Sequence, residues 1–145
     1  MQPQYIFLII WLIAAILICT KFVIDGRKAL KPFPKLDNSN FIYQEDGASG
    51  YSTKSFITKY GGANKALRIR VTDEELWITT NTFMASIADR FDLLHRIPIQ
   101  NLKSVTRNRM KIQIRFDHNG ISKSIILLSK DPEKLFQLLI AKMSF

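Results

Sequence analysis

The sequence has a single cysteine, Cys19, among its 145 residues. One cysteine cannot form a disulfide within the chain, and it excludes zinc sites built from several cysteines. The sequence also lacks a Walker loop, a GxSxG elbow, an HExxH motif and a Rossmann glycine fingerprint. We therefore expect a protein that is not an enzyme and that uses no cofactor and no metal.

The polar residues that could suggest a site do not form a recognisable set. Ser49 lies between small residues in GASG, and the sequence places no histidine or acid beside it. His95 and His118 have Asp89 and Asp92 in their neighbourhood, but the spacing provides no second pair of metal ligands. We interpret these side chains as ordinary surface polar residues.

No charged residue interrupts the segment from Tyr5 to Thr20, and extending it to Ile24 adds only Lys21. A helix of about 20 residues is roughly 30 Å long, which matches the hydrocarbon core of a bilayer. A secretory signal has basic residues before its apolar segment and a small-residue cleavage pattern after it. This sequence has neither. We expect a retained transmembrane anchor in residues 1–25, with Cys19 as one of its apolar residues.

Basic residues follow the anchor and none precedes it. They are Lys21, Arg27, Lys28, Lys31 and Lys35, against one acid, Asp25. Because basic residues beside a span stay in the cytoplasm, we expect a single-pass protein of the inner or plasma membrane. Its N-terminus would lie outside, and its C-terminal domain would be cytoplasmic. The net charge of +9 then favours membrane lipids over nucleic acid as partners.

The remaining sequence predicts one β-rich domain. Residues 26–50 are basic, then polar and glycine-rich, and we expect a linker there. Alternation of apolar residues and turn signals predict strands over residues 53–60, 65–72, 76–80, 93–99, 103–108, 111–117 and 122–128. Asn119-Gly120 favours a tight hairpin turn, and Asp131-Pro132 favours the start of a final amphipathic helix.

Three stretches of this region resemble a known group of domains. They are GGANKALRIRVTDEELWI, HRIPIQNLKSV and SIILLSKDPEKLFQLL, and they are similar to bacterial PH-like and GRAM-like families. The resemblance implies a mainly β (α+β) fold in residues 51–145, a PH-like barrel of about seven antiparallel strands capped by a C-terminal helix. It also implies a non-enzymatic binding or assembly module that is often associated with membranes.

Two groups of basic residues could bind anionic lipid. In eukaryotic PH domains a lysine followed after a gap by basic-x-basic marks headgroup binding, and Lys59 with Arg68-Ile69-Arg70 resembles this pattern. A second group lies on a predicted hairpin, where guanidinium groups could meet phosphates. The alternative for both is a solvated basic surface. The candidate residues are Lys59, Lys65, Arg68, Arg70, Arg107, Arg109 and Lys111.

The stretch NTFMASIADRFDLL separates two predicted strands by more residues than a turn needs. Phe83, Ile87 and Phe91 recur every four residues and share one face if the stretch is helical. The face would either cover an edge of the barrel or dock a protein partner.

The first hypothesis for function is a membrane-anchored, non-enzymatic binding or scaffolding module on the cytoplasmic face, with a membrane protein and membrane lipids as partners. One alternative is a module that recognises anionic lipid headgroups. Another is an accessory subunit of a membrane enzyme complex.

Overall fold

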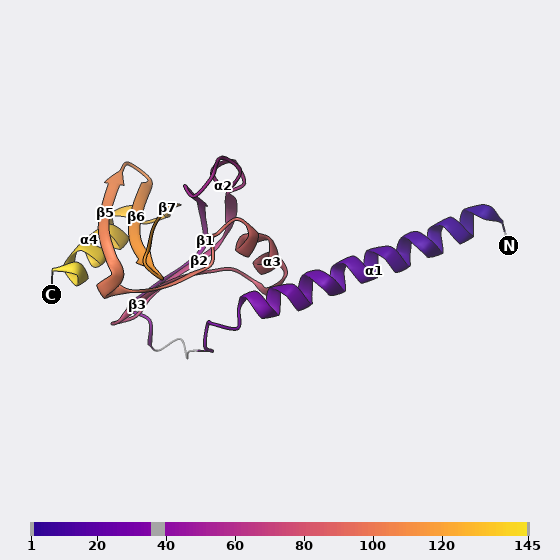
Figure 1. Cartoon of the computed structure of the whole chain (residues 1–145), viewed down its shortest axis with the longest axis horizontal. Coiled ribbons are helices and arrows are strands. Elements are labelled where there is room, and N and C mark those ends of the chain that lie inside the picture. The colour runs from indigo at the N-terminus through magenta and orange to yellow at the C-terminus, as the bar shows by residue number, and fades with distance from the viewer. Residues whose placement is uncertain (1, 36–39, 145) are drawn as a thin grey trace.

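A long N-terminal helix projects from one side of a β-rich domain (Figure 1). The computed structural model describes residues 2–35 and 40–144 of the chain. The helix, α1, is Pro3–Ala29, and its apolar window has a mean hydropathy of 2.7 with none of it buried. Among the described residues it is the one helix long and apolar enough to cross a membrane.

The domain is an antiparallel sheet with short helices inserted between strands. The strands in the described part of the chain are β1 (Tyr43–Ser52), β2 (Ala63–Val71), β3 (Glu75–Thr79), β4 (His95–Pro98), β5 (Leu102–Asn108), β6 (Lys111–His118) and β7 (Ile121–Leu128). Their order is β4-β3-β2-β1-β7-β6-β5. The helices of the domain are α2 (Phe56–Tyr60), α3 (Thr82–Arg90) and α4 (Pro132–Met143), with a 3-10 turn at Ile99–Asn101. The predicted mainly β architecture with a C-terminal helix is confirmed.

The central strand, β1, lies within the segment that was expected to be a linker. It pairs first with β2 and then, over Ser49–Ser52, with β7. Gly47 has φ +82° at a register shift between Asp46 and Ala48. A bulge of this kind bends a strand, which lets β1 contribute to both halves of the sheet. The glycines that suggested a linker therefore serve a curved strand, while residues 36–39 of the expected linker lie outside the described residues.

The strand expected over residues 53–60 is wrong, because this stretch forms α2. Ser55 and Thr58 form a capping box: the Thr58 N–H donates to Ser55 Oγ at 3.2 Å, and the Ser55 N–H donates to Thr58 Oγ1 at 2.8 Å. Such local hydrogen bonds favour a helix start over an extended chain.

The other predicted strands and the final helix are confirmed. Leu67, Ile69 and Val71 of β2 point into the core, as their alternation predicts, and all three are fully buried. The α4 helix begins where expected, because Asp131 accepts a hydrogen bond from the Lys134 N–H at 3.2 Å. Its Leu135 joins the same core.

Candidate functional site

The end of α1 packs directly against α3. Gly26 is buried, and a Cβ placed on it would lie 1.8 Å from the backbone oxygen of Thr82. One turn earlier, the rings of Phe22 and Phe83 are 5.7 Å apart. The two helices therefore meet through their backbones at one point and through aromatic side chains at the next. The C-terminal end of the long helix is therefore packed on the domain.

After α1 the chain turns back along the outer face of β3. The Leu30 N–H donates to the Gly26 oxygen and the Phe33 N–H donates to the Leu30 oxygen, both at 3.0 Å. Phe33 and Phe41 then pack edge-on against the Trp77 ring, with centroids 6.0 and 5.7 Å away. The described residues that follow α1 are thus held against the sheet by aromatic contacts.

A partly exposed charge pair on the sheet lies beneath this segment. Arg96 donates through Nε to Glu75 Oε2 at 2.7 Å and through Nη1 to the Pro32 oxygen at 3.2 Å. Trp77 Nε1 donates to the same Glu75 oxygen at 2.7 Å. Burial alone would raise the pKa of Glu75, but the hydrogen bonds from Arg96 and Trp77 hold this pKa below its usual range.

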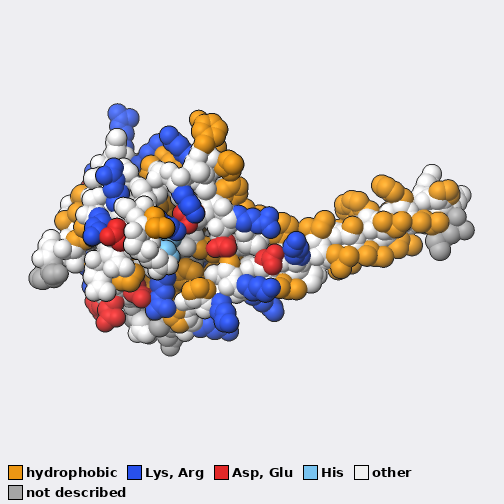
Figure 2. Space-filling model, in the orientation of Figure 1, with side chains coloured by type: hydrophobic (Ala, Val, Ile, Leu, Met, Phe, Trp, Pro, Cys, Tyr) orange, Lys and Arg blue, Asp and Glu red, His pale blue; other side chains and the backbone are white. Residues whose placement is uncertain are grey.

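Between the returning segment and the sheet lies an open groove of about 650 Å³, which we call the basic groove. It brings together residues that the sequence keeps apart. Its basic lining residues are Arg27, Lys31, Lys35, Arg68 and Arg70. The space-filling view shows lysine and arginine side chains gathered where α1 meets the domain (Figure 2).

The charge in the basic groove is only partly compensated. Asp46 lies 3.7 Å from Arg68 Nε and 3.4 Å from Arg70 Nη2, and it is two-thirds exposed. Arg70 also donates to Gln44 at 2.6 Å and stacks over the Phe41 ring at 5.1 Å. Within the described residues, no salt bridge involves the other three basic side chains of the groove. Such a surface attracts phosphate-bearing anions.

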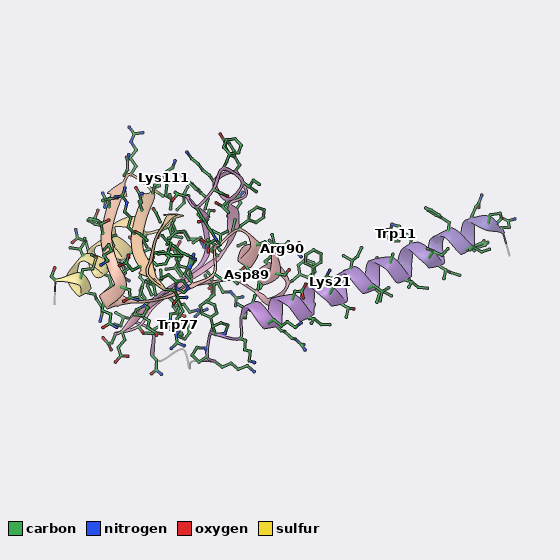
Figure 3. All side chains as sticks on the ribbon, viewed as in Figure 1. Trp11, Lys21, Trp77, Asp89, Arg90 and Lys111 are labelled. Carbon is green, nitrogen blue, oxygen red and sulfur yellow. The ribbon has the colours of Figure 1, made fainter. Side chains whose placement is uncertain are left out.

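The predicted lipid-binding residues do not form one site. Arg68 and Arg70 line the basic groove, whereas Lys59 lies on α2 and Lys65 at the start of β2, with φ +51°. The second predicted group is on the β5–β6 hairpin, on the side of the domain away from α1, where Lys111 is labelled (Figure 3). The members of this second group are Arg107, which pairs with Glu133, Arg109 and Lys111.

The predicted docking residues do not form one exposed surface either. Phe83 points to α1 and is half-exposed, while Phe91 packs on the domain itself. A Cβ on Gly61 would lie 2.1 Å from the Phe91 ring, so this ring fills the space that the glycine leaves. Ile87 lies with Phe91 around a small cavity of about 50 Å³. The stretch does form a helix, α3, and this helix lies between α1 and the sheet (Figure 1).

A polar cluster that the sequence does not reveal closes one end of the sheet. Asp92, with φ +54°, accepts from Lys123 Nζ at 2.8 Å and from Ser52 Oγ at 3.3 Å. His95 is buried, not on the surface as expected, and its Nε2 lies 2.7 Å from the backbone carbonyl oxygen of Asp92. Burial lowers the pKa of His95 more than the nearby Asp92 carboxylate raises it. No group of three or more metal-binding side chains occurs among the described residues.

No family model and no curated protein sequence matches this chain. Solved structures do match it. The DH/PH domains of p115-RhoGEF align with a TM-score of 0.54 over 90% of this chain and 41% of that chain, at 12% identity. The complex of the FERM and C-terminal domains of Drosophila Merlin aligns with a TM-score of 0.40 over 74% of this chain and 30% of that chain, at 14% identity.

This chain therefore spans less than half the length of the structures it matches. At such low identity the likeness concerns the fold alone. The first match, the antiparallel strand order and the C-terminal helix together define a PH-like fold.

Proposed function

We propose that this protein is a single-pass membrane protein whose PH-like domain serves, without catalysis of its own, as a binding or scaffolding module on the cytoplasmic face. Its partners would be membrane lipids and a membrane protein. The observation that carries the proposal is the contact between Gly26 of α1 and Thr82 of α3. A flexible linker would be enough to keep a domain near a membrane. A helix that packs against the domain also fixes the orientation of the domain relative to that helix.

The finer likeness to bacterial PH-like and GRAM-like families is part of the same proposal. The positions of the quoted motifs support it. The TDEE sequence, residues 72–75, comprises the turn between β2 and β3 and the first residue of β3, Glu75. The segment IPIQNL, residues 97–102, runs from β4 through the 3-10 turn into β5.

The orientation in the membrane can be tested with reporters. We expect a reporter fused after the last residue to be active only if it is of the kind that works in the cytoplasm. Replacing Arg27, Lys28, Lys31 and Lys35 with glutamine should weaken this bias, because these residues supply the positive charge beside the span. Activity of the external reporter alone in the unaltered chain would refute the topology.

A second candidate function, binding of anionic lipid headgroups, is favoured by the basic groove. There the residues after the span meet Arg68 and Arg70 of β2. The test uses the full chain in nanodiscs of phosphatidylcholine and phosphatidylglycerol, with retained lipids counted by native mass spectrometry.

We expect Arg68→Glu with Arg70→Glu to retain fewer anionic lipids, more clearly at low salt. The matched control is Arg109→Glu with Lys111→Glu, which makes the same charge change on the hairpin away from α1. Equal retention by the groove variant and the unaltered chain would remove the groove from consideration.

A further inference from the structure

The short helix α2 carries apolar side chains that nothing in the described chain covers. Phe56, Ile57 and Tyr60 are 76%, 72% and 75% exposed. Outside α1, they are the most exposed of the large apolar side chains in the described residues. The Phe56 and Tyr60 rings are 4.6 Å apart and form one cluster. Exposure of three such groups together indicates a surface that is covered in use.

The cluster is held in a defined position. The Ser55–Thr58 capping box closes the first turn of α2, and Thr58 is buried. After the helix, Gly61 receives the Phe91 ring from the end of α3. Because α3 packs on α1 in turn, a series of contacts fixes the position of α2 relative to the long helix.

The α2 helix lies at the end of the domain from which α1 leaves (Figure 1). Figure 1 shows α2 and α3 at the α1 end of the domain, with β5, β6 and α4 at the other. At the position of α2, Figure 2 shows hydrophobic side chains on the edge that faces the long helix. Lys54 precedes the cluster in sequence and Lys59 lies between Ile57 and Tyr60, and both lysines are exposed. Aromatic and apolar groups beside lysines suit the boundary between lipid headgroups and acyl chains.

We propose that α2 is a second membrane contact, and that Phe56, Ile57 and Tyr60 insert into the headgroup–acyl boundary of the bilayer that α1 crosses. The inference rests on the proposed function, because it needs α1 as the anchor. A protein occupant is less well matched to this surface. Specific protein interfaces bury about 800 Å² on each partner, far more than one five-residue helix offers. A second contact with a bilayer needs no such area, since α1 already confines the domain to the surface.

The test measures how close α2 lies to lipid in the full chain. Ile57→Cys in a Cys19→Ser background gives one site for an environment-sensitive fluorophore. The chain is reconstituted in liposomes of phosphatidylcholine and phosphatidylglycerol, with or without lipids that carry a quencher on the upper acyl chain, for the labels at residues 57 and 110, or near the end of the acyl chain, for the label at residue 12. Met110→Cys is the matched control, because Met110 is exposed at 53% in the β5–β6 turn. Leu12→Cys reports on the span itself.

We expect the Ile57 label to be quenched at least twofold more than the Met110 label. Phe56→Ser with Tyr60→Ser should remove most of the difference, and the high exposure of both residues makes unfolding an unsuitable explanation. Quenching at Leu12 with none at Ile57 would overturn the inference and leave the anchor intact. Absence of quenching at both sites would overturn the inference and the proposed function together. Shielding of Ile57 that rises with protein density, without lipid quenching, would assign the cluster to a second copy and overturn the inference.

Discussion

The contact between α1 and α3 makes Gly26→Ala a severe test of the proposed docking. The added Cβ would lie 1.8 Å from the Thr82 oxygen, and the carbon of the same carbonyl is 2.9 Å away. Both atoms belong to the backbone, so no side-chain rotation relieves the clash. The helices must move apart, and the packing of Phe22 on Phe83 weakens with them.

Two effects of this substitution oppose each other, and only one bears on docking. Alanine is a better helix former than glycine by about 1 kcal/mol. This gain is the same whether α1 is docked or free, because α1 is helical in both states, so it cancels. The clash acts on the docked state alone, and overpacking of this kind costs about 1–3 kcal/mol. The docking equilibrium should therefore shift by roughly 5- to 150-fold.

Hydrogen exchange on the full chain in nanodiscs measures this shift. The α3 amides, including those of Ala85 and Ala88, should exchange faster in Gly26→Ala by that factor, because their protection depends on the docked state. Thr20→Ala is the control: it raises helix propensity in α1 at an exposed position, where the side chain bonds only to its own helix at Ile16. Equal α3 protection in Gly26→Ala and the unaltered chain would refute the close contact.

Three further predictions concern stability. Burial lowers the pKa of His95 from its ordinary 6.5, so the unfolded chain binds more protons below that pH, and the unfolding free energy should fall as pH drops from about 6.5; urea titrations should show a flatter pH dependence for His95→Gln, and an equal pH dependence in this variant and the unaltered chain would contradict the prediction. The Glu45 carboxylate accepts hydrogen bonds from the Tyr43 hydroxyl at 2.7 Å, the Ser129 hydroxyl at 2.5 Å and the Lys130 N–H at 2.7 Å. Glu45→Ala should therefore lower the free energy of unfolding, measured in urea, by about 1–3 kcal/mol for each donor left unpaired. The control Glu74→Ala, in an exposed turn, should change it by no more than about 0.5 kcal/mol. Phe91→Ala should lower the melting temperature more than Phe83→Ala, because Phe91 packs against the core and Phe83 is half-exposed; the reverse order would contradict the assignment of Phe91 to the core.

The sheet could be predicted from sequence wherever alternation and turns agreed. Residues 111–117 alternate apolar and polar side chains, and residues 122–128 follow the Asn119-Gly120 turn signal; the two predicted strands correspond to β6 and β7. The prediction was wrong where a sequence pattern typical of one local structure occurs in another. Gly47 and Gly50 suggested a linker, but glycine also lets β1 bend and approach its neighbours closely: a Cβ on Gly50 would lie 2.9 Å from the Ile126 oxygen.

The sequence contains a pattern that predicts a helix at α2, where weak alternation had predicted a strand. The S-x-x-T spacing of Ser55 and Thr58 forms reciprocal caps, and Gly61-Gly62 follows the last turn. Weak alternation in the same residues favoured a strand, and the tertiary fit of Phe91 on Gly61 could not be inferred from either pattern. Local propensities conflict here, and packing decides between them.

The basic groove could not have been predicted, because no sequence spacing links its two halves. In the sequence, Arg27 and Lys31 predict membrane topology, and Arg68 and Arg70 are candidates for binding anionic lipid, but nothing indicates that the two pairs lie together. The turn after α1 and the packing of Phe33 on Trp77 bring the halves together. Long-range pairings of this kind depend on the whole fold.

The glycines at the junction suggest how the domain is coupled to its helix. Gly26 admits a backbone oxygen of α3, and Gly61 admits the Phe91 ring from the other end of α3. Because glycine has no side chain, no rotamer change at Gly26 or Gly61 can accommodate a displacement of the neighbouring element. A shift of α1 is therefore transmitted to α3, and a shift of α3 is transmitted to α2. If α1 tilts in the bilayer, the basic groove and the α2 cluster tilt with it. If α1 crosses a bilayer as proposed, the close contact at Gly26 would help to set which surface of the domain faces the membrane.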